Sequence, residues 1–295
     1  MKSIICFGEV LWDMLPGGKK LGGAPLNVSL RAQSFGNQAA MISSIGRDRS
    51  GAELLDKMKA HGGSLEHIQE SELFPTSEVL VKLDAHGTAS YEIKMPCAWD
   101  SIILLERDLE AVRKADVLIY GSLVARSQVS RETLFALLEE ARYKVFDVNL
   151  RPPHYTTERI VSLMKAADFV KFNDEELYEI CASLGFQDKS LEKCIHFISE
   201  QTRTEQVCVT LGKDGAVLFY KQAFCYNPGY QVTVADTVGA GDSFLASLIS
   251  QLLHGSQPQD AINMACAVGS IVASKNGANP EVSTSEIKSI MESVH

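Results

Sequence analysis

The sequence has no long hydrophobic run. No stretch approaches the roughly 18 consecutive apolar residues that a membrane-spanning helix needs. The apolar run at the N-terminus is interrupted by Glu9 and is too short for the core of a signal peptide. These absences predict a soluble protein that is neither secreted nor embedded in a membrane.

Patterns for disulfide frameworks and zinc sites are also missing. The seven cysteines are scattered and include no Cys-x-x-Cys pair, and the seven histidines include no His-Glu-x-x-His arrangement. An odd number of widely spaced cysteines excludes a regular disulfide framework and gives no zinc spacing. We therefore expect reduced, partly buried thiols in a cytoplasmic protein.

Positive charge is scarce. Lys and Arg number 28 against 37 Asp and Glu, which gives a formal net charge of -9. Such a chain lacks the basic surface of a nucleic-acid-binding protein. Any anionic ligand must therefore be bound by a local anion-binding motif. Two common phosphate-binding motifs are absent. There is no Gly-x-x-x-x-Gly-Lys-[Ser/Thr] loop. The first apolar run is followed by Gly8, but not by the further glycines of a dinucleotide-binding motif.

What the sequence does contain is a regular alternation of short apolar runs and longer helical patterns over its 295 residues. This alternation predicts an α/β fold with a mostly parallel sheet and helices on both faces. We predict strands at 4–7, 39–45, 116–120, 144–148, 168–172, 206–211 and 230–235. We predict helices at 25–35, 50–61, 105–114, 129–142, 157–166, 174–184, 190–202, 240–253, 258–274 and 284–293.

The segment 73–95 breaks this alternation. Residues 76–83 and 88–94 are typical of two strands, and the polar residues 84–87 between them are typical of a hairpin turn. No linker rich in Gly, Pro or Ser divides the chain, and there is no internal repeat. We therefore expect a single domain over 1–295 with a small β excursion that covers a site.

The most informative segment is 231–244. An alternating stretch at 231–234 is followed by Asp236, a turn containing Gly239 and Gly241, and an apolar helical pattern. Unpaired amides at the start of a helix, together with its dipole, form an anion site. Asp242 lies in that first turn, where a carboxylate either stabilises the helix dipole or acts as a general base. The pattern alone leaves both interpretations open.

A second glycine segment lies near the N-terminus. Gly22 and Gly23 precede a proline suited to the first turn of a helix. The pair is typical of a tight turn, or of close backbone approach to a ligand with the Asn27 amide available for hydroxyl groups. Asp13 is either a solvated loop residue or an acceptor for sugar hydroxyls. We interpret Lys20, like the lysine before it, as part of a solvated turn.

These two segments resemble the two signatures of a known family. Gly22-Gly23-x-x-x-Asn27 and the segment 236–242 (Asp-Thr-Val-Gly-Ala-Gly-Asp) lie about 210 residues apart. In that order they resemble the motifs of the ribokinase-like (PfkB) carbohydrate kinases, and the fructokinases among them most. The resemblance implies a three-layer α/β/α sandwich with a β lid formed by about 10–21 and 73–95. It also implies ATP-dependent phosphorylation of a sugar's primary hydroxyl, with D-fructose giving fructose 6-phosphate.

The resemblance carries roles over to matching positions. Asp242 would be the general base, and the amides of Gly239, Ala240 and Gly241, with its own, would form the anion hole. Sugar-binding residues would be Asp13, Gly22, Gly23, Asn27 and Arg151. Nucleotide-binding residues would be Asn173, Thr210, Gly212, Gly215 and Asn263. Glu176 would handle Mg²⁺ and phosphate, and Asp236, Val238 and Gly277 would form a K⁺ site.

Several alternatives stay open beside these roles. Glu176 is also typical of surface charge, Asn263 of a satisfied helix residue and Arg151 of a structural salt bridge. The rival substrates are 2-keto-3-deoxygluconate and ribose, and a non-enzyme alternative is an inactive sugar-sensing relative. That alternative predicts damage to the anion turn, whose glycines and Asp242 are intact. The expected partners are the sugar, ATP and a second copy of the chain bound through the lid, without nucleic acid or membrane.

Overall fold

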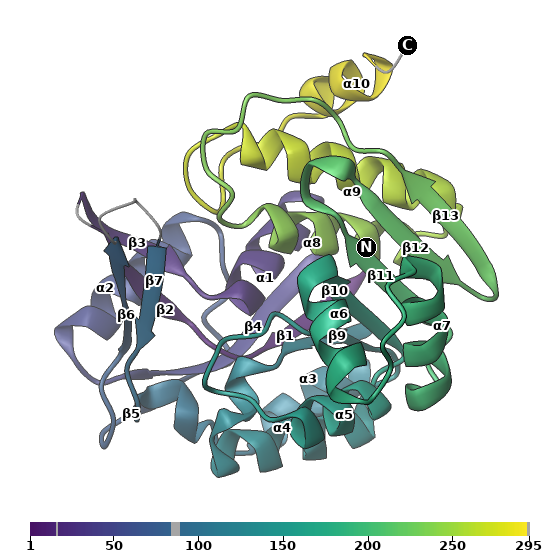
Figure 1. The fold of residues 1–295 in the computed structure, drawn as a ribbon. Coiled ribbons are helices and arrows are strands. Elements are labelled where there is room, and N and C mark those ends of the chain that lie inside the picture. Colours follow the sequence, from purple (N-terminus) through teal and green to yellow (C-terminus); the bar gives the residue numbers. More distant parts are fainter. Residues whose placement is uncertain (16, 84–88, 294–295) are drawn as a thin grey trace.

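The computed structural model describes residues 1–15, 17–83 and 89–293 and contains one large and one small sheet (Figure 1). Within this part of the chain, the large sheet has the strand order β13-β12-β11-β10-β9-β8-β1-β4-β5. Its strands are β1 (Ser3–Phe7), β4 (Gln38–Gly46), β5 (Ile68–Ser71), β8 (Val117–Gly121), β9 (Lys144–Asp147), β10 (Phe169–Asn173), β11 (Gln206–Thr210), β12 (Ala216–Tyr220) and β13 (Ala223–Asn227). Neighbours are parallel except at β11–β12 and β12–β13, which are antiparallel.

Helices cover both faces of this sheet (Figure 1). One layer contains α1 (Ala24–Ser34), α2 (Arg49–Ala60), α8 (Ala240–Leu253) and α9 (Pro258–Ala273), with α10 (Thr284–Glu292) packed on α9. The other contains α3 (Glu106–Lys114), α4 (Gln128–Glu140), α5 (Thr157–Lys165), α6 (Asp174–Ser183) and α7 (Leu191–Thr202). Because side chains alternate along a strand, Ile4 of β1 packs into the first layer and Ile5 into the second. The predicted α/β/α sandwich is confirmed.

The small sheet stands beside α2 at one end of the large sheet (Figure 1). Its order is β3-β2-β6-β7, formed by β2 (Leu11–Leu15), β3 (Gly18–Gly22), β6 (Ser77–Leu83) and β7 (Ala89–Ile93). The central pair β2–β6 is parallel, and both outer pairs are antiparallel. The two predicted lid segments therefore form one sheet, while the predicted turn at 84–87 lies outside the described residues.

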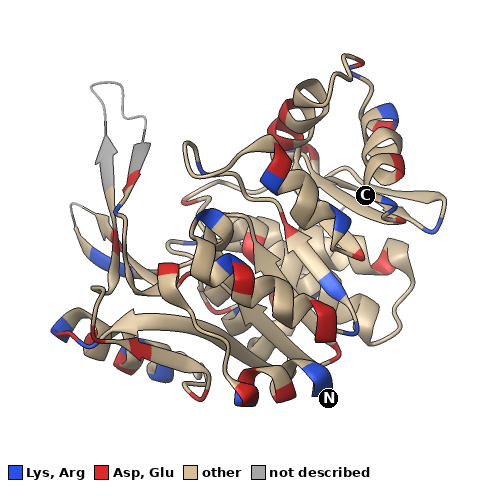
Figure 2. Cartoon of the chain, turned by 90° about the horizontal axis from the view of Figure 1, so that it is seen from below, with Lys and Arg blue, Asp and Glu red and all other residues tan. Residues whose placement is uncertain are grey.

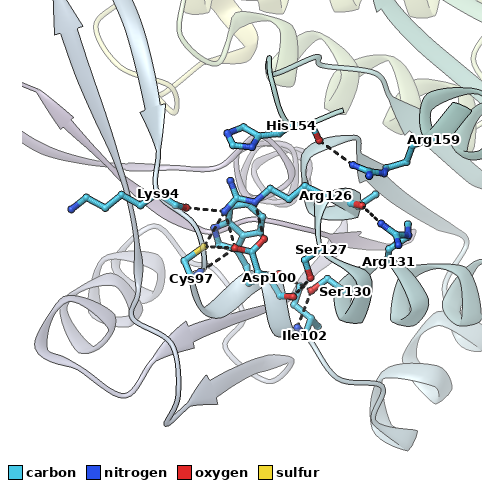
Figure 3. A network of polar contacts seen from close by, with 12 residues as sticks. Lys94, Cys97, Asp100, Ile102, Arg126, Ser127, Ser130, Arg131, His154 and Arg159 are labelled. Carbon is cyan, nitrogen blue, oxygen red and sulfur yellow. Dashed lines mark hydrogen bonds and ion pairs between the residues drawn. The ribbon is translucent and has the colours of Figure 1, made fainter. Parts of the chain in front are cut away.

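A buried ion pair anchors the exit of β7 to the body of the protein (Figure 3). Arg126, at the end of the short helix η2 (Leu123–Arg126), donates from Nε and Nη2 to the two carboxylate oxygens of Asp100, at 2.7 and 2.8 Å. The same Nη2 donates to the carbonyl oxygen of Lys94, directly after β7, at 2.8 Å. The Arg126 guanidinium also lies 4.0 Å from the centre of the Trp99 ring. The small sheet is thus fixed to the core where this strand leaves it.

The entry into β6 is anchored separately. Asp48, the N-cap of α2, accepts hydrogen bonds from the backbone amide and the hydroxyl of Thr76, both at 2.8 Å. It also accepts one from the Gly51 amide at 2.7 Å. One carboxylate therefore joins the start of α2 to the residue directly before β6.

One predicted strand is wrong. Residues 230–235 form an irregular segment, although 231–234 alternates in polarity. The sheet edge is already occupied by the hairpin of β12 and β13, which the sequence analysis did not predict, and Val234 is 59% exposed. Without a neighbouring strand or a buried face, alternation does not make a strand. The apolar run 216–220 was the signal for the hairpin.

The described residues carry mixed charges on their surface. Acidic and basic positions are interspersed over the helices and loops in Figure 2. Among these residues no helix is long and apolar enough to cross a membrane.

Candidate active site

The predicted site residues converge at the carboxyl edge of the large sheet. Asp147, Asn173 and Thr210 end the parallel strands β9, β10 and β11, and Arg151 lies in the loop after β9. Parallel strands present their carboxyl ends at one edge, where ligands of open α/β sheets bind. The N-termini of α1 and α8 meet beside this edge, since Asn27 of α1 contacts Asp242 of α8.

The start of α8 depends on a glycine. Gly239 is the N-cap with φ 76°, and a side chain there would collide with the carbonyl oxygen of Ala278. The Ala240 amide donates back to the Thr237 carbonyl at 3.2 Å. The anion site predicted at this turn therefore depends more on the Gly241 and Asp242 amides than on that of Ala240.

Asp242 is held in place by two asparagines. Asn27 donates from Nδ2 to Oδ2 of Asp242 at 2.8 Å, and Asn279 donates to Oδ1 of Asn27 at 2.7 Å. Burial, and then the negative charge of Asp147, raise the pKa of Asp242 to about 6, although the Asn27 hydrogen bond and nearby cations oppose the shift. A carboxyl group with this pKa is still mostly ionised at neutral pH.

A buried lysine lies under the anion turn. Lys171 of β10 donates to Oδ1 of Asp147 at 3.0 Å, and a side chain added at Gly241 would lie 3.5 Å from the Lys171 ammonium. Burial lowers the pKa of Lys171, but the charges of Asp147 and Glu176 outweigh it and the net shift is upward. Lys171 was not predicted as a site residue, although a lysine within an apolar strand was an available signal.

The predicted sugar-binding residues Asp13, Gly22 and Gly23 lie in β2 and at the junction of β3 and α1. A side chain at Gly22 would collide with the Asp13 carboxylate, and one at Gly23, with φ 113°, would collide with the Glu9 carbonyl. Gly23 is thus required by the backbone itself, whereas a side chain at Gly22 would displace the side chains of Asp13 and Leu11. Burial raises the pKa of Asp13 to about 6, against the opposing charges of Arg151 and Lys20.

Glu9 is a further residue of the site that was not predicted from the sequence. Its side chain is only 3% exposed, and its Oε2 has no hydrogen-bond partner among the described residues. Burial raises its pKa to about 7, opposed by its own amide and the charge of Arg151 and reinforced by Asp242. An acidic residue directly after the first buried strand was the available signal. The positive charge of Arg151 lowers the pKa of Glu9, Asp13 and Asp242 against the upward effect of burial.

The predicted nucleotide-binding residues form a second group near the ends of β10 and β11. Gly212 opens the short helix η3 (Gly212–Asp214), and Gly215, with φ 88°, leaves no room for a side chain against the Asn227 carbonyl. Asn263 of α9 accepts from Asn227 Nδ2 at 2.9 Å. The Thr210 hydroxyl donates to the Phe172 carbonyl at 3.3 Å.

The predicted metal-binding residues are engaged with backbone groups. Glu176 accepts from the amides of Leu150 and Asn173, both at 2.9 Å, and forms a capping box with Asn173 at the start of α6. Its pKa is raised, chiefly by burial. Among the described residues no group of three His, Cys, Asp or Glu side chains could hold a metal ion.

Asp236 joins the predicted K⁺ residues. Its two carboxylate oxygens accept from the amides of Val238 and Gly277, each at 3.0 Å. The three residues are thus brought together around one carboxylate. Because both of its oxygens accept from backbone amides, the carboxylate links the turn before α8 to the segment at Gly277.

Comparisons with known proteins agree with this geometry. The family model described as "pfkB family carbohydrate kinase" matches residues 5–285. The chain belongs to this family. It is accordingly an ATP-dependent sugar kinase. It is 28% identical over 310 aligned positions to fructokinase-2 of Solanum lycopersicum, with 95% of this chain and 93% of the relative covered.

Solved structures share the fold of this carbohydrate kinase. A fructokinase double mutant from Vibrio cholerae O395, in fructose-, ADP- and potassium-ion-bound form, superposes with a TM-score of 0.84 at 23% identity, covering 99% of this chain and 98% of that one. Ribokinase from Thermotoga maritima superposes with a TM-score of 0.82 at 19% identity, covering 99% and 100%. The fold is therefore ribokinase-like.

Proposed function

We propose that this kinase transfers the terminal phosphoryl group of ATP to the primary hydroxyl of D-fructose, giving fructose 6-phosphate, with Asp242 as general base. The observation that carries the proposal is the position of Asp242. It lies at the N-terminus of α8, is oriented by Asn27 at 2.8 Å, and has a pKa raised to about 6. The similarity to fructokinases supports the choice of sugar.

In this mechanism Asp242 takes the proton of the sugar hydroxyl as its oxygen attacks the γ-phosphorus. The bond from that phosphorus to the leaving oxygen of ADP breaks as the new bond forms. A pKa nearer to neutrality makes a carboxylate a better base than an unperturbed aspartate. The Gly241 and Asp242 amides would stabilise charge on the transferred group, and Lys171 beneath them would add a fixed positive charge.

The charges around Arg151 favour a neutral sugar over the keto acid. Arg151 already acts on the carboxylates of Glu9, Asp13 and Asp242. A substrate carboxylate would add a further negative charge to this group, whereas the hydroxyls of fructose can donate to Asp13. The arrangement therefore supports fructose ahead of 2-keto-3-deoxygluconate.

The other partners are proposed on the same basis. The nucleotide would bind Asn173, Thr210, Gly212, Gly215 and Asn263. Mg²⁺ would be held mainly by the ATP phosphates, because the Glu176 oxygens already accept two amides, and its chemistry is to neutralise phosphate charge. K⁺ would bind near Asp236, Val238 and Gly277. A homodimer would form through the small sheet.

The function is tested by measuring ADP release with Mg²⁺ and K⁺ on fructose, 2-keto-3-deoxygluconate, ribose and adenosine. We expect the highest kcat/KM with fructose. Asp242→Asn should lower kcat by a factor of about 10²–10⁴ while sugar and ATP binding persist. Asp56→Asn, at an exposed position of α2, is the matched control. Near-normal turnover by Asp242→Asn would remove the base assignment, and no turnover of any sugar by the unmodified protein would remove the proposed substrate class.

A further inference from the structure

Two adjacent lysines of the lid have different surroundings. Lys19 and Lys20 lie in β3, not in the solvated turn that the sequence analysis assigned to them. Successive side chains of a strand point to opposite faces. The Lys19 ammonium lies 4.5 Å from the centre of the Trp12 ring and forms an ion pair with Glu53 of α2. Lys19 is therefore directed to α2.

Lys20 is directed to the anion turn. Its ammonium lies 3.9 Å from Oδ2 of Asp236, which begins the turn that leads into α8. A side chain added at Gly277 would lie 4.0 Å from the same ammonium. On β2 its register partner is Asp13, whose pKa it lowers. Lys20 thus lies between the predicted sugar-binding carboxylate and the turn that precedes Asp242.

The pairing of Lys20 with Asp236 is loose. A separation of 3.9 Å is too long for a hydrogen bond, and the Lys20 side chain is 50% exposed. The Asp236 oxygens already accept from the backbone amides of Val238 and Gly277. An exposed pair of this kind contributes little to stability, so the ammonium can turn to another anion at small cost.

Two other cations lie near the turn. Lys171 is buried in an ion pair with Asp147, and Arg151 donates from Nη1 to the Leu150 carbonyl at 2.8 Å. A triphosphate entering this site meets several carboxylates, and the chain lacks the lysine of a Gly-x-x-x-x-Gly-Lys loop. A lysine ammonium on a lid is a mobile point charge of the kind that binds phosphate.

We propose that Lys20 is a phosphate-binding residue of the lid, whose ammonium moves from Asp236 to the terminal phosphoryl group of the bound nucleoside triphosphate. This inference rests on the proposed kinase function, because it places that group over the Gly241 and Asp242 amides. Lys20 then carries part of the charge neutralisation that a loop lysine supplies in other phosphate-binding folds. It also couples the position of the lid to the presence of the third phosphate.

The decisive measurement is binding, because it does not require turnover. Dissociation constants for ADP and for a non-hydrolysable ATP analogue, each with Mg²⁺, are measured by titration calorimetry for Lys20→Met and for the matched control Lys19→Met. We expect Lys20→Met to weaken binding of the analogue about tenfold or more, and of ADP less than about threefold. Lys19→Met should change neither, and Lys20→Arg should recover most of the analogue affinity, because it keeps the charge.

Kinetics separates this inference from the proposed function. Lys20→Met should lower kcat for the sugar about tenfold to a hundredfold, less than the loss of an oxyanion-hole donor because Lys20 is half exposed. If the unmodified protein phosphorylates a sugar but Lys20→Met and Lys19→Met behave alike, only the role of Lys20 is refuted. Equal losses of ADP and analogue affinity in Lys20→Met would likewise refute the contact with the third phosphate. If no sugar is turned over, the binding comparison still decides the question.

Discussion

The hydrogen bond from Asn27 to Asp242 gives a quantitative prediction about pH. Asn27→Ala removes the Nδ2 donor that lies 2.8 Å from the carboxylate. This donor lowers the pKa of Asp242 against the upward effect of burial. A hydrogen bond to a charged group contributes about 1.5–3 kcal/mol, and one pKa unit corresponds to about 1.4 kcal/mol. Since water can replace part of the lost bond, we expect the pKa to rise by about one unit.

The sign follows from the role of the base. Asp242 must be ionised to accept a proton, so activity falls as pH falls through its pKa in the folded protein. Raising that pKa from about 6 to about 7 moves the acid limb of kcat/KM to higher pH. The pH-dependent part of the loss relative to the unmodified enzyme is about fivefold at pH 6 and vanishes near pH 9, and any loss of sugar binding by Asn27 adds a factor that is the same at every pH.

The assay is kcat/KM for the sugar between pH 5 and 9, with ATP saturating. The pKa of Asp13 is also raised to about 6 by burial, but the Asn27 amide donates to Asp242 and is not among the groups that shift the pKa of Asp13. Only one of the two ionisations should therefore move. Asn279→Ala, which loosens the Asn27 side chain, should shift the limb in the same direction by a smaller amount. A loss of activity by Asn27→Ala that is the same at every pH would refute the electrostatic role.

Two further predictions concern stability. Arg126→Met should lower the free energy of unfolding by about 3–5 kcal/mol, because it leaves Asp100 buried without its cation, and a loss below about 1 kcal/mol in urea denaturation would contradict this. Gly239→Ala should lower the free energy of unfolding by about 1–3 kcal/mol and reduce kcat, because the new side chain strains the turn and collides with Ala278. The control is Gly255→Ala, where φ is 85° but the space around the residue is open. It should lose only the stability that the strain at positive φ costs, and its kcat should not change.

Most of the fold could be predicted because each layer is encoded locally. The first strand and the helix that begins at Ala24 follow from an apolar run and from a glycine pair before Pro25. The stretch 231–234 shows where this reasoning fails, because polarity alternates there without any partner strand. Whether a strand forms depends on which sheet edge is free, and a local pattern does not contain that information.

The two glycine motifs of the candidate site could be predicted from the sequence, but the charged residues that surround them could not. Gly239 and Asp242 belong to a continuous segment whose helix start is visible in sequence. The contacts of Lys171, Glu9 and Lys20 join segments that are far apart in the chain, so they depend on strand order and lid position. Lys20 is the clearest case, since its neighbour Lys19 has the same chemistry and only the alternation of β3 separates their surroundings.

The positions of these cations explain how a chain with a net negative charge can bind an anionic nucleotide. A net charge of -9 works against phosphate at long range, but exposed charges farther away than about 10 Å are largely screened by salt. Lys171 comes from β10, Arg151 from the loop after β9 and Lys20 from the lid, and each lies near a carboxylate of the site. Because two of the three are tied to the rigid sheet and one to the lid, removing Lys20 should alter nucleotide binding while leaving the fixed charge around Asp242 in place.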